Sequence, residues 1–223
     1  MRIINVINDF LKIFFKIRSS KVKNYYKRTV SFDNQKNQIT EKKYLSKIIL
    51  NKKIKKILDY GCNNCSLKLY LSKKITYWGV DTNKDINKHV RLYSKNFKII
   101  KKNIPFKDNY FDCVILSHVI SHLDNPRLNI QKISKKLKKN GFLIIVTPNK
   151  LYKFFIFFLN LFNNYESDLT IYKHFSNKEI EKKILNKSWK VIDSFSYSIR
   201  NNKITYGILN SRCIIIAKKT IKN

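Results

Sequence analysis

The sequence predicts an α/β protein built on a seven-stranded, mostly parallel β-sheet with helices on both faces and an antiparallel last strand. Three observations support this fold class. From about residue 41 onward, strand-length apolar runs alternate with amphipathic segments, a glycine-containing polar turn follows the first run, and an acidic residue ends the second. Such alternation is typical of βαβ units with right-handed crossovers. The 223 residues, of which 43% are hydrophobic, suffice for one well-buried domain.

The expected elements follow one another in a regular order. The apolar runs predicted as strands are 55–60, 75–81, 97–101, 111–117, 142–147, 189–197 and 212–218. The predicted helices between them are 41–50, 65–73, 84–95, 126–139, 151–162 and 176–187. No clear helix separates the last two strands, so we expect an antiparallel pair there. This is a Rossmann-like arrangement, in which ligands bind at the carboxyl ends of the strands.

The chain divides into an N-terminal segment and a main domain. Residues 1–40 are expected to hold an amphipathic helix over 3–18 and a polar cap or linker. Residues 41–223 form the main domain, with an apolar lid insert around 150–175. The stretch 151–162, LYKFFIFFLNLF, is too short to cross a bilayer. It is interpreted either as a lid helix that packs on the core or, together with the N-terminal helix and nearby lysines, as a surface that touches lipid.

The formal net charge of +33 is the most extreme feature of the composition. A strongly basic protein is a candidate for binding nucleic acid or an anionic membrane. However, 40 of the 47 basic residues are lysine, asparagine occurs 26 times and Ala217 is the only alanine. That composition is typical of an AT-rich genome, and the lysines are scattered along the chain rather than clustered. We therefore favour a solvated basic surface of compositional origin over a selected polyanion partner.

The cysteines and the N-terminus indicate a cytoplasmic protein. Cys113 and Cys213 lie inside apolar runs, where free thiols behave as small buried hydrophobic groups. Polar and charged residues interrupt the first 18 residues, so they do not resemble the apolar segment of a signal peptide. Without a secretory signature, reduced cysteines are the expectation.

Acidic and hydroxyl side chains end three of the predicted strands. In ILDYGCNNCSL, Asp59 ends a strand and Gly61 lies in the turn that follows, where it allows a ligand to approach the backbone. Asp81 ends the next strand, and an acid at that place can accept hydrogen bonds from both hydroxyls of a ribose. Ser117 ends the fourth strand. Each alone is more often a polar strand end or a helix cap, but together they predict one nucleoside-binding crevice.

Several ordered motifs resemble those of class I S-adenosylmethionine-dependent methyltransferases. The matching stretches within residues 55–148 are ILDYGC, WGVDTN, NIPFKDNYFDCVILSHVISHLDNP and KKLKKNGFLIIVTPN. They are most similar to the type-11 group, which includes quinone-biosynthesis and sugar or lipid methyltransferases. A weaker likeness continues through HFSNKEIEKKILNKSWKVI, so the resemblance covers residues 41–220.

The resemblance implies S-adenosylmethionine as the cofactor and assigns its contacts. Asp59 would order the loop near the methionine end, Asp81 would hold the ribose, and Ser117 would lie under the methionyl group. Thr82 and Ile104 would flank the adenine, where Asn103 is the nearest neutral polar side chain. The implied cofactor-binding residues are Asp59, Gly61, Cys62, Asn63, Asp81, Thr82, Asn103, Ile104 and Ser117.

The chain departs from the family pattern in two places. The family loop usually has glycine at the positions of Gly61, Asn63 and Cys65, and only the first is glycine here. If the loop binds the cofactor, Asn63 must adopt a left-handed or turn conformation, and Cys65 must point away from the methionine. The family also commonly has an acid before a Leu-Pro-Phe segment, which resembles Ile-Pro-Phe at residues 104–106 here. That acid is absent, since residues 100–102 read Ile-Lys-Lys.

Cysteine and histidine residues near this loop could in principle bind zinc or act in redox chemistry, but their spacing does not favour either. Cys62 and Cys65 have CxxC spacing and His118 and His122 are four residues apart, but the long separation of the two pairs matches no compact zinc module. We expect no metal ion and no thioredoxin-like redox role. Methyl transfer needs a general base only if the acceptor loses its proton early, and His118, His122 and His174 are the candidates.

The sequence therefore predicts methyl transfer to a small-molecule or lipid-linked acceptor, with peripheral membrane contact. One alternative is an RNA methyltransferase, which the charge favours. Against it, the Pro-Asn after the fifth strand is not the (D/N)PP(Y/F) motif of base-amino methyltransferases, and no separate RNA-binding module is visible. The other alternative is a catalytically silent methyltransferase-like binding protein, which the missing loop glycines favour.

Overall fold

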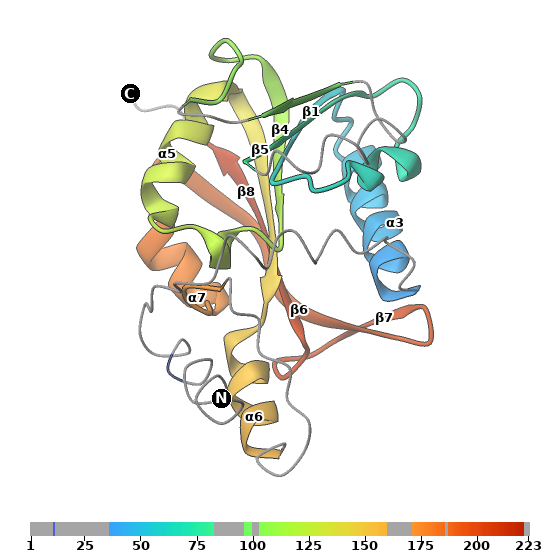
Figure 1. Cartoon of the computed structure of the whole chain (residues 1–223), viewed down its shortest axis with the longest axis vertical. Coiled ribbons are helices and arrows are strands. Elements are labelled where there is room, and N and C mark those ends of the chain that lie inside the picture. The colour runs from blue at the N-terminus through green and yellow to red at the C-terminus, as the bar shows by residue number, and fades with distance from the viewer. Residues whose placement is uncertain are drawn as a thin grey trace.

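The computed structural model describes residues 36–82, 96–99, 103–159, 171–185 and 187–220, with Leu11 alone before them. Its centre is an eight-stranded sheet with the order β3-β2-β1-β4-β5-β8-β6-β7 (Figure 1). The expected helices 3–18 and 84–95 lie outside the described residues. No helix in the described part of the chain is long and apolar enough to span a bilayer.

The strands form a parallel half and an antiparallel half. The parallel strands are β1 (Lys56–Tyr60), β2 (Thr76–Asp81), β3 (Phe97–Ile99), β4 (Phe111–Ser117) and β5 (Leu137–Pro148). The antiparallel half consists of β6 (Trp189–Arg200), β7 (Lys203–Tyr206) and β8 (Arg212–Lys219). Strand β8 lies between β5 and β6 and is antiparallel to both. All seven predicted strands are present, and the mostly parallel sheet with antiparallel last strands is confirmed.

The prediction missed β7, so the sheet has eight strands rather than seven. Asn201 and Asn202, with φ of 49° and 60°, form the two-residue turn that joins β6 to β7. A hairpin turn of this kind requires positive φ at both central residues, and asparagine tolerates it. β7 is short and mostly exposed, so it has no apolar run by which to recognise it.

The helices among the described residues differ in length from those predicted. They are α3 (Lys36–Asn51), α5 (Pro126–Lys136), α6 (Lys150–Leu159) and α7 (Asn177–Glu179), with 3₁₀ turns at Ser66–Tyr70 and Ile120–His122 and a π turn at Ile180–Ile184. α3 begins five residues before the predicted helix and crosses the expected boundary after residue 40. The predicted helices 126–139 and 176–187 end early, because β5 already begins at Leu137 and the π turn ends at Ile184.

The predicted helix 65–73 was wrong, since only a five-residue 3₁₀ turn forms there. After the loop that follows β1, the chain must return along the strand before β2 starts at Thr76, opposite Lys56. A 3₁₀ turn rises about 2.0 Å per residue against about 1.5 Å for an α-helix, so it covers more of that distance. The backbone of Leu71, just after the turn, is extended and carries the chain on toward the start of β2.

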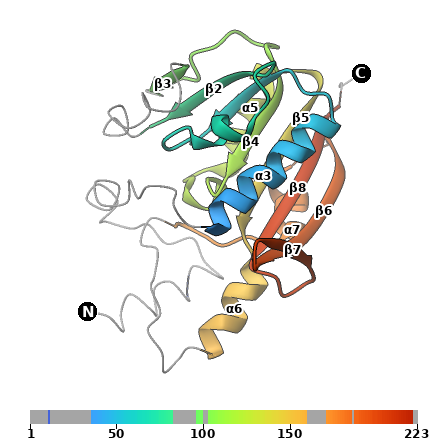
Figure 2. The same ribbon diagram turned by 90° about the vertical axis from the view of Figure 1, so that its right-hand side faces the viewer.

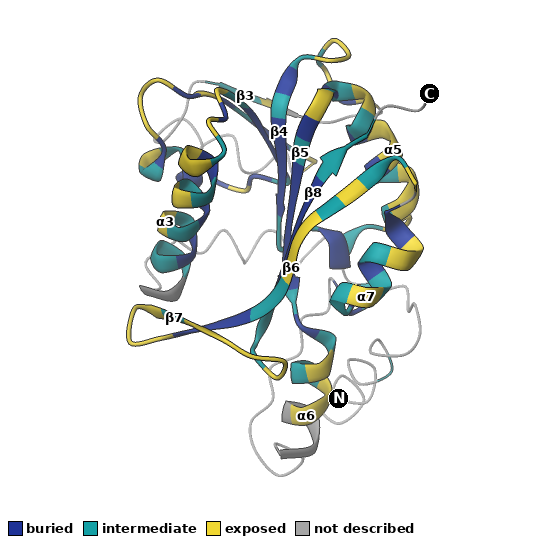
Figure 3. Cartoon of the chain, turned by 180° about the vertical axis from the view of Figure 1, so that it is seen from behind, coloured by how far each residue is buried: buried dark blue, intermediate teal, exposed yellow. Residues whose placement is uncertain are grey.

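Two apolar cores lie on the two faces of the sheet. Figure 2 shows α3 on one face of the sheet and α5 on the other. Alternate residues of the strands face opposite sides, so Ile57 joins the core under α3 while Leu58 joins the core under α5 and α7. Burial is greatest along β4 and β5 at the centre of the sheet and falls toward β7 (Figure 3). Helices on both faces are therefore confirmed.

The core under α3 contains a close contact between Cys65 and the next strand. Cys65 has a φ of 60° and is fully buried, and its Sγ lies 3.3 Å from that of Cys62. A Cβ atom built on Gly79 of β2 would lie 2.4 Å from Cys65 Sγ and 2.7 Å from Cys62 Sγ. The two thiols therefore occupy the space that the missing side chain at Gly79 leaves open.

We predict that Gly79→Ala destabilises the fold by about 1–3 kcal/mol, the usual cost of overpacking a core. Cys65→Gly in the same chain should recover much of that loss, because it removes the nearer of the two sulfur atoms. Denaturant unfolding of both single variants and of the double variant measures the coupling. Strictly additive effects would show that the two positions do not compete for space.

Candidate cofactor-binding site

The loop after β1 is fixed by backbone geometry and by β2. Gly61 has a φ of 75°, and a Cβ atom there would lie 2.4 Å from Cγ2 of Val119, so neither the conformation nor the space suits another residue. The amides of Gly61 and Cys62 both donate to the carbonyl of Val80, at 2.7 and 3.1 Å. These contacts hold the loop backbone against the carboxyl end of β2.

The carboxylates of Asp59 and Asp81 lie on either side of this loop. Asp81 Oδ2 accepts a hydrogen bond from the Asn63 amide at 3.0 Å, which ties the loop to the end of β2. Asp59 is 4% exposed, and its Oδ2 accepts from the Tyr77 hydroxyl at 2.7 Å. Burial and then the nearby Asp59 carboxylate raise the pKa of Tyr77, so the phenol keeps the proton that it donates.

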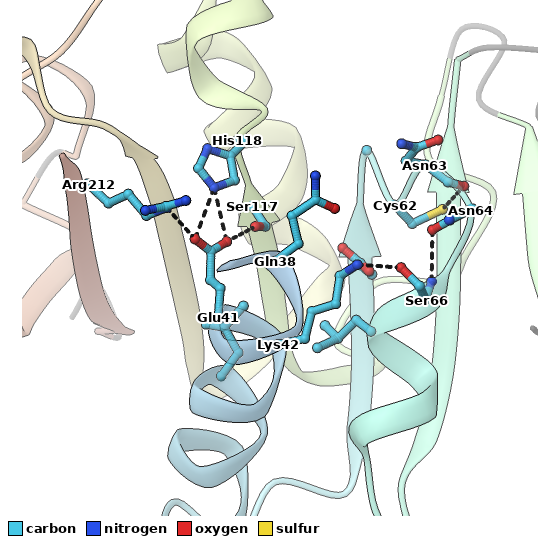
Figure 4. Close-up of a pocket in the computed structure, with 14 residues that line it drawn as sticks. Gln38, Glu41, Lys42, Cys62, Asn63, Asn64, Ser66, Ser117, His118 and Arg212 are labelled. Atoms are coloured by element: carbon cyan, nitrogen blue, oxygen red, sulfur yellow. Dashed lines mark hydrogen bonds and ion pairs between the residues drawn. The ribbon is translucent and has the colours of Figure 1, made fainter. Parts of the chain in front are cut away.

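A cavity of about 330 Å³ opens beside the loop (Figure 4). Its walls come from α3, the end of β1 with the loop and 3₁₀ turn that follow it, the end of β4 and the start of β8. The lining residues are Gln38, Glu41, Lys42, Leu45, Asp59, Gly61, Cys62, Asn63, Asn64, Ser66, Leu67, Ser117, His118 and Arg212. This volume is on the scale of small-ligand pockets.

The structure brings together only part of the predicted site. Asp59, Gly61, Cys62, Asn63 and Ser117 line the cavity. The remaining four predicted residues do not line the cavity: Asp81, Thr82, Asn103 and Ile104. Asp81 nevertheless contacts the loop, since it accepts a hydrogen bond from the Asn63 amide. Of these four, Ile104 is 7% exposed and packs in the core, while Thr82 and Asn103 are exposed.

The geometry required of the altered loop positions is confirmed. Asn63 has a φ of 46°, so it adopts the left-handed conformation that replaces the missing glycine. Cys65 is fully buried, points toward Cys62 and Gly79, and does not line the cavity. Neither departure from the glycine pattern blocks the cavity.

The three histidine candidates occupy different environments. His118 follows the carboxyl end of β4 and lines the cavity, whereas His122 lies in the next 3₁₀ turn and His174 is fully buried. His118 Nε2 lies 3.0 and 3.2 Å from the two carboxylate oxygens of Glu41. Among the described residues, no cluster of three or more histidine, cysteine or acidic side chains is arranged to hold a metal ion.

Glu41 of α3 is the residue that the sequence analysis missed. Its side chain is 7% exposed, and it accepts hydrogen bonds from the hydroxyls of Ser117 and Tyr197, both at 3.1 Å. Arg212 Nε lies 2.8 Å from Glu41 Oε2 and forms an ion pair with it. Its only local signal is that it is one of 14 acidic residues in a strongly basic chain. Its hydrogen-bond partners are 76 to 156 residues away, so no local pattern identifies it.

The environment of Glu41 keeps it ionised. Burial alone would raise the pKa of the carboxyl, but His118, Arg212 and Tyr197 outweigh that effect and lower the pKa from 4.5 to about 2. A carboxyl with a lowered pKa in the folded state stabilises the fold above its unfolded-state value. That contribution is complete above about pH 4.5 and is lost as the pH falls toward 2.

Comparison with known proteins assigns the chain to one family. A model of a family described as a methyltransferase domain matches residues 33–191. The chain belongs to this methyltransferase domain family. Its sequence is 24% identical over 182 residues to the ubiquinone biosynthesis O-methyltransferase of Pelagibacter ubique, which covers 75% of each chain.

Solved structures share the fold. A SAM-dependent methyltransferase from Archaeoglobus fulgidus superposes with a TM-score of 0.58 at 21% identity, covering 87% of this chain and 99% of the other. A protein from Pyrococcus horikoshii superposes with a TM-score of 0.65 at 17% identity, covering 88% and 99%. The protein is accordingly a methyltransferase, and S-adenosylmethionine is the cofactor that its family and fold imply.

The chemistry of the cavity fits this cofactor. The loop at Gly61 presents bare backbone, since no Cβ atom could be placed there. Lys42 and Asp59 both line this space and offer groups of opposite charge to the zwitterionic amino-acid end of the cofactor, and Lys42 also donates to Ser66 Oγ at 2.6 Å. Asp81 adds a carboxylate at the edge of the loop, suited to ribose hydroxyls.

We predict that Asp81→Ala abolishes or severely weakens S-adenosylmethionine binding and leaves the fold intact. The substitution removes charge-assisted hydrogen bonds worth on the order of 2–4 kcal/mol in total, and it also frees the Asn63 amide. Titration calorimetry and circular dichroism measure the two effects. Asp108→Ala is the matched control, because Asp108 is an exposed carboxylate paired with Lys136. Equal affinity of the Asp81 variant and the wild type would refute the assignment.

Proposed function

We propose that this methyltransferase acts on a small-molecule or lipid-linked acceptor that binds beside the cofactor. The observation that carries the proposal is the cavity of about 330 Å³, which combines the cofactor loop with the polar side chains of His118 and Arg212. The Pelagibacter ubique relative is described as an O-methyltransferase of ubiquinone biosynthesis, which supports an acceptor of this class.

The residues of the chain bind and orient the reactants. The bound cofactor supplies a methyl carbon activated by a sulfonium centre. Transfer of that carbon is an in-line displacement, so the protein contributes mainly orientation and exclusion of water. The loop at Gly61 and Asn63 fixes one reactant, and the wall formed by α3 and Arg212 bounds the space left for the other.

Exposed apolar side chains support an acceptor attached to lipid. Leu151, Phe154 and Phe155 of α6 are 37–46% exposed, and Ile208 and Leu209 are 75% and 53% exposed. The side-chain amide of Asn149, just before α6, donates to the carbonyls of Ile208 and Asn210, both at 2.8 Å, which joins the two apolar groups.

The strand that leads into α6 passes beside the cavity. Pro148, two residues before α6, pairs with the cavity residue Arg212 in the sheet. A basic protein with exposed aromatic and aliphatic side chains is suited to the surface of an anionic bilayer. The proposed enzyme is cytoplasmic and contacts the membrane from its periphery.

The acceptor class is tested with S-adenosylmethionine labelled in its methyl group. The protein is incubated with the small-molecule, lipid and RNA fractions of a bacterial extract. We expect label in the small-molecule or lipid fraction and the same yield after ribonuclease treatment. Label confined to RNA would contradict the proposal and favour the RNA methyltransferase.

Membrane contact is tested by flotation with vesicles of neutral and anionic phospholipid. We expect Phe154→Asp with Ile208→Asp to lower the bound fraction several-fold. The control is Leu50→Asp with Leu128→Asp, which changes the charge equally at apolar residues 66% and 45% exposed elsewhere. Equal losses in both double variants would show that charge alone drives binding.

A further inference from the structure

We propose that His118 is the general base that removes the proton from an acceptor hydroxyl, and that Glu41 is the residue that positions it. This inference rests on the proposed function and narrows the acceptor to a hydroxyl-bearing molecule. It stands on the contact of one histidine ring nitrogen with both oxygens of a buried carboxylate.

The hydrogen bond from His118 to Glu41 selects one form of the imidazole ring. A carboxylate only accepts hydrogen bonds, so Nε2, which lies 3.0 Å from it, must carry a proton. In the neutral ring, Nδ1 then holds the lone pair. Nδ1 forms no hydrogen bond to any residue that the structure describes. Nδ1 is therefore the ring atom that can accept a proton. In other histidine–carboxylate pairs the carboxylate likewise fixes the tautomer of the ring.

Glu41 is held rigidly enough for this role. The Ser117 hydroxyl, the Tyr197 hydroxyl and Arg212 Nε each contact the carboxylate, from β4, β6 and β8 respectively. The pKa of about 2 keeps the carboxylate ionised throughout the range in which a histidine base operates. Three contacts from three strands leave the carboxylate little freedom to turn away from the imidazole.

The backbone of His118 supports a functional rather than a packing role. Its φ is 57°, a left-handed conformation that costs free energy in a residue with a side chain. Its amide donates to the carbonyl of Val146 at 2.8 Å, which holds that conformation against β5. The side chain is 39% exposed, so the strain does not serve to bury it. The result is an imidazole directed into the same cavity as the loop at Gly61.

Other charges face this cavity from each wall. Arg212 from β8 contacts Glu41, Lys42 from α3 contacts Ser66, and Asp59 lies at the end of β1. The positive charge of Arg212 offsets that of the Glu41 carboxylate. Glu41 therefore orients the imidazole as one member of an ion pair with Arg212 and not as an isolated anion.

The proposed step is balanced without a further reactant. A bond forms between the acceptor oxygen and the methyl carbon as the carbon–sulfur bond breaks, and the electron pair of that bond goes to sulfur. The hydroxyl proton passes to His118 Nδ1 and later to water. A hydroxyl is a poor nucleophile until it loses its proton, whereas a neutral amine attacks through its own lone pair. A base at this position therefore favours oxygen over nitrogen acceptors.

The ring form is measured without any acceptor, by nitrogen NMR of protein labelled in its four histidines. The spectrum of His118→Gln identifies the signals of His118. We expect the neutral ring of the wild type to carry its proton on Nε2, and Glu41→Gln to produce a mixture of tautomers, while Glu41→Asp partly restores the single form. A ring protonated on Nδ1 in the wild type, or one unchanged in Glu41→Gln, would overturn the proposal.

Catalysis is measured with 3,4-dihydroxybenzoate as the acceptor and with the hydroxyl acceptor found in the labelled fractions. We expect His118→Gln to lower kcat about 10²–10⁴-fold with KM and cofactor affinity within a few-fold, and to remove the fall in rate toward acid pH. His89→Gln, which replaces the histidine not named as a candidate base, is the matched control. Unchanged kcat in His118→Gln would exclude the base. If the wild type transferred no methyl group to any fraction, the proposed function would be refuted. The tautomer measurement does not depend on that result.

Discussion

The buried Glu41 carboxylate is the constraint on which the site depends. It connects α3 to β4, β6 and β8 through three kinds of partner: hydroxyls, a histidine ring and an arginine. Loss of an ionised group at such a place leaves several buried donors without an acceptor, which costs more than any single hydrogen bond contributes. The position of α3, and hence one wall of the cavity, follows from this contact.

The sheet topology explains why residues so far apart in sequence meet here. β1 and β4 are neighbours although 50 residues lie between them in the sequence, and β8 inserts between β5 and β6. The carboxyl ends of the parallel strands and the start of the antiparallel β8 therefore lie at one edge. That edge is the usual ligand-binding position of an open α/β sheet. The residues that line the cavity lie at strand ends, in the loop and 3₁₀ turn after β1, just after β4, or on α3.

Local patterns predicted the strand ends but not the contacts between them. Asp59, Gly61 and Ser117 could be placed because alternating burial and turn residues mark where each strand stops. Glu41 and Arg212 could not, because only the folded chain brings them together. β7 was missed because a two-residue turn and an exposed strand carry no apolar periodicity. The 65–73 helix failed because the length of the return path, rather than helix propensity, determines that backbone.

The contact of Cys65 with Gly79 restricts the routes by which such a loop can evolve. A side chain at position 65 is tolerated because position 79, on the neighbouring strand, has none. In a chain that retained a Cβ atom at 79, a change of the loop glycine to cysteine would clash at once. A Cβ atom at 79 and the thiol at 65 compete for one space, so a larger residue at 79 requires a smaller one at 65 or a shift of the backbone.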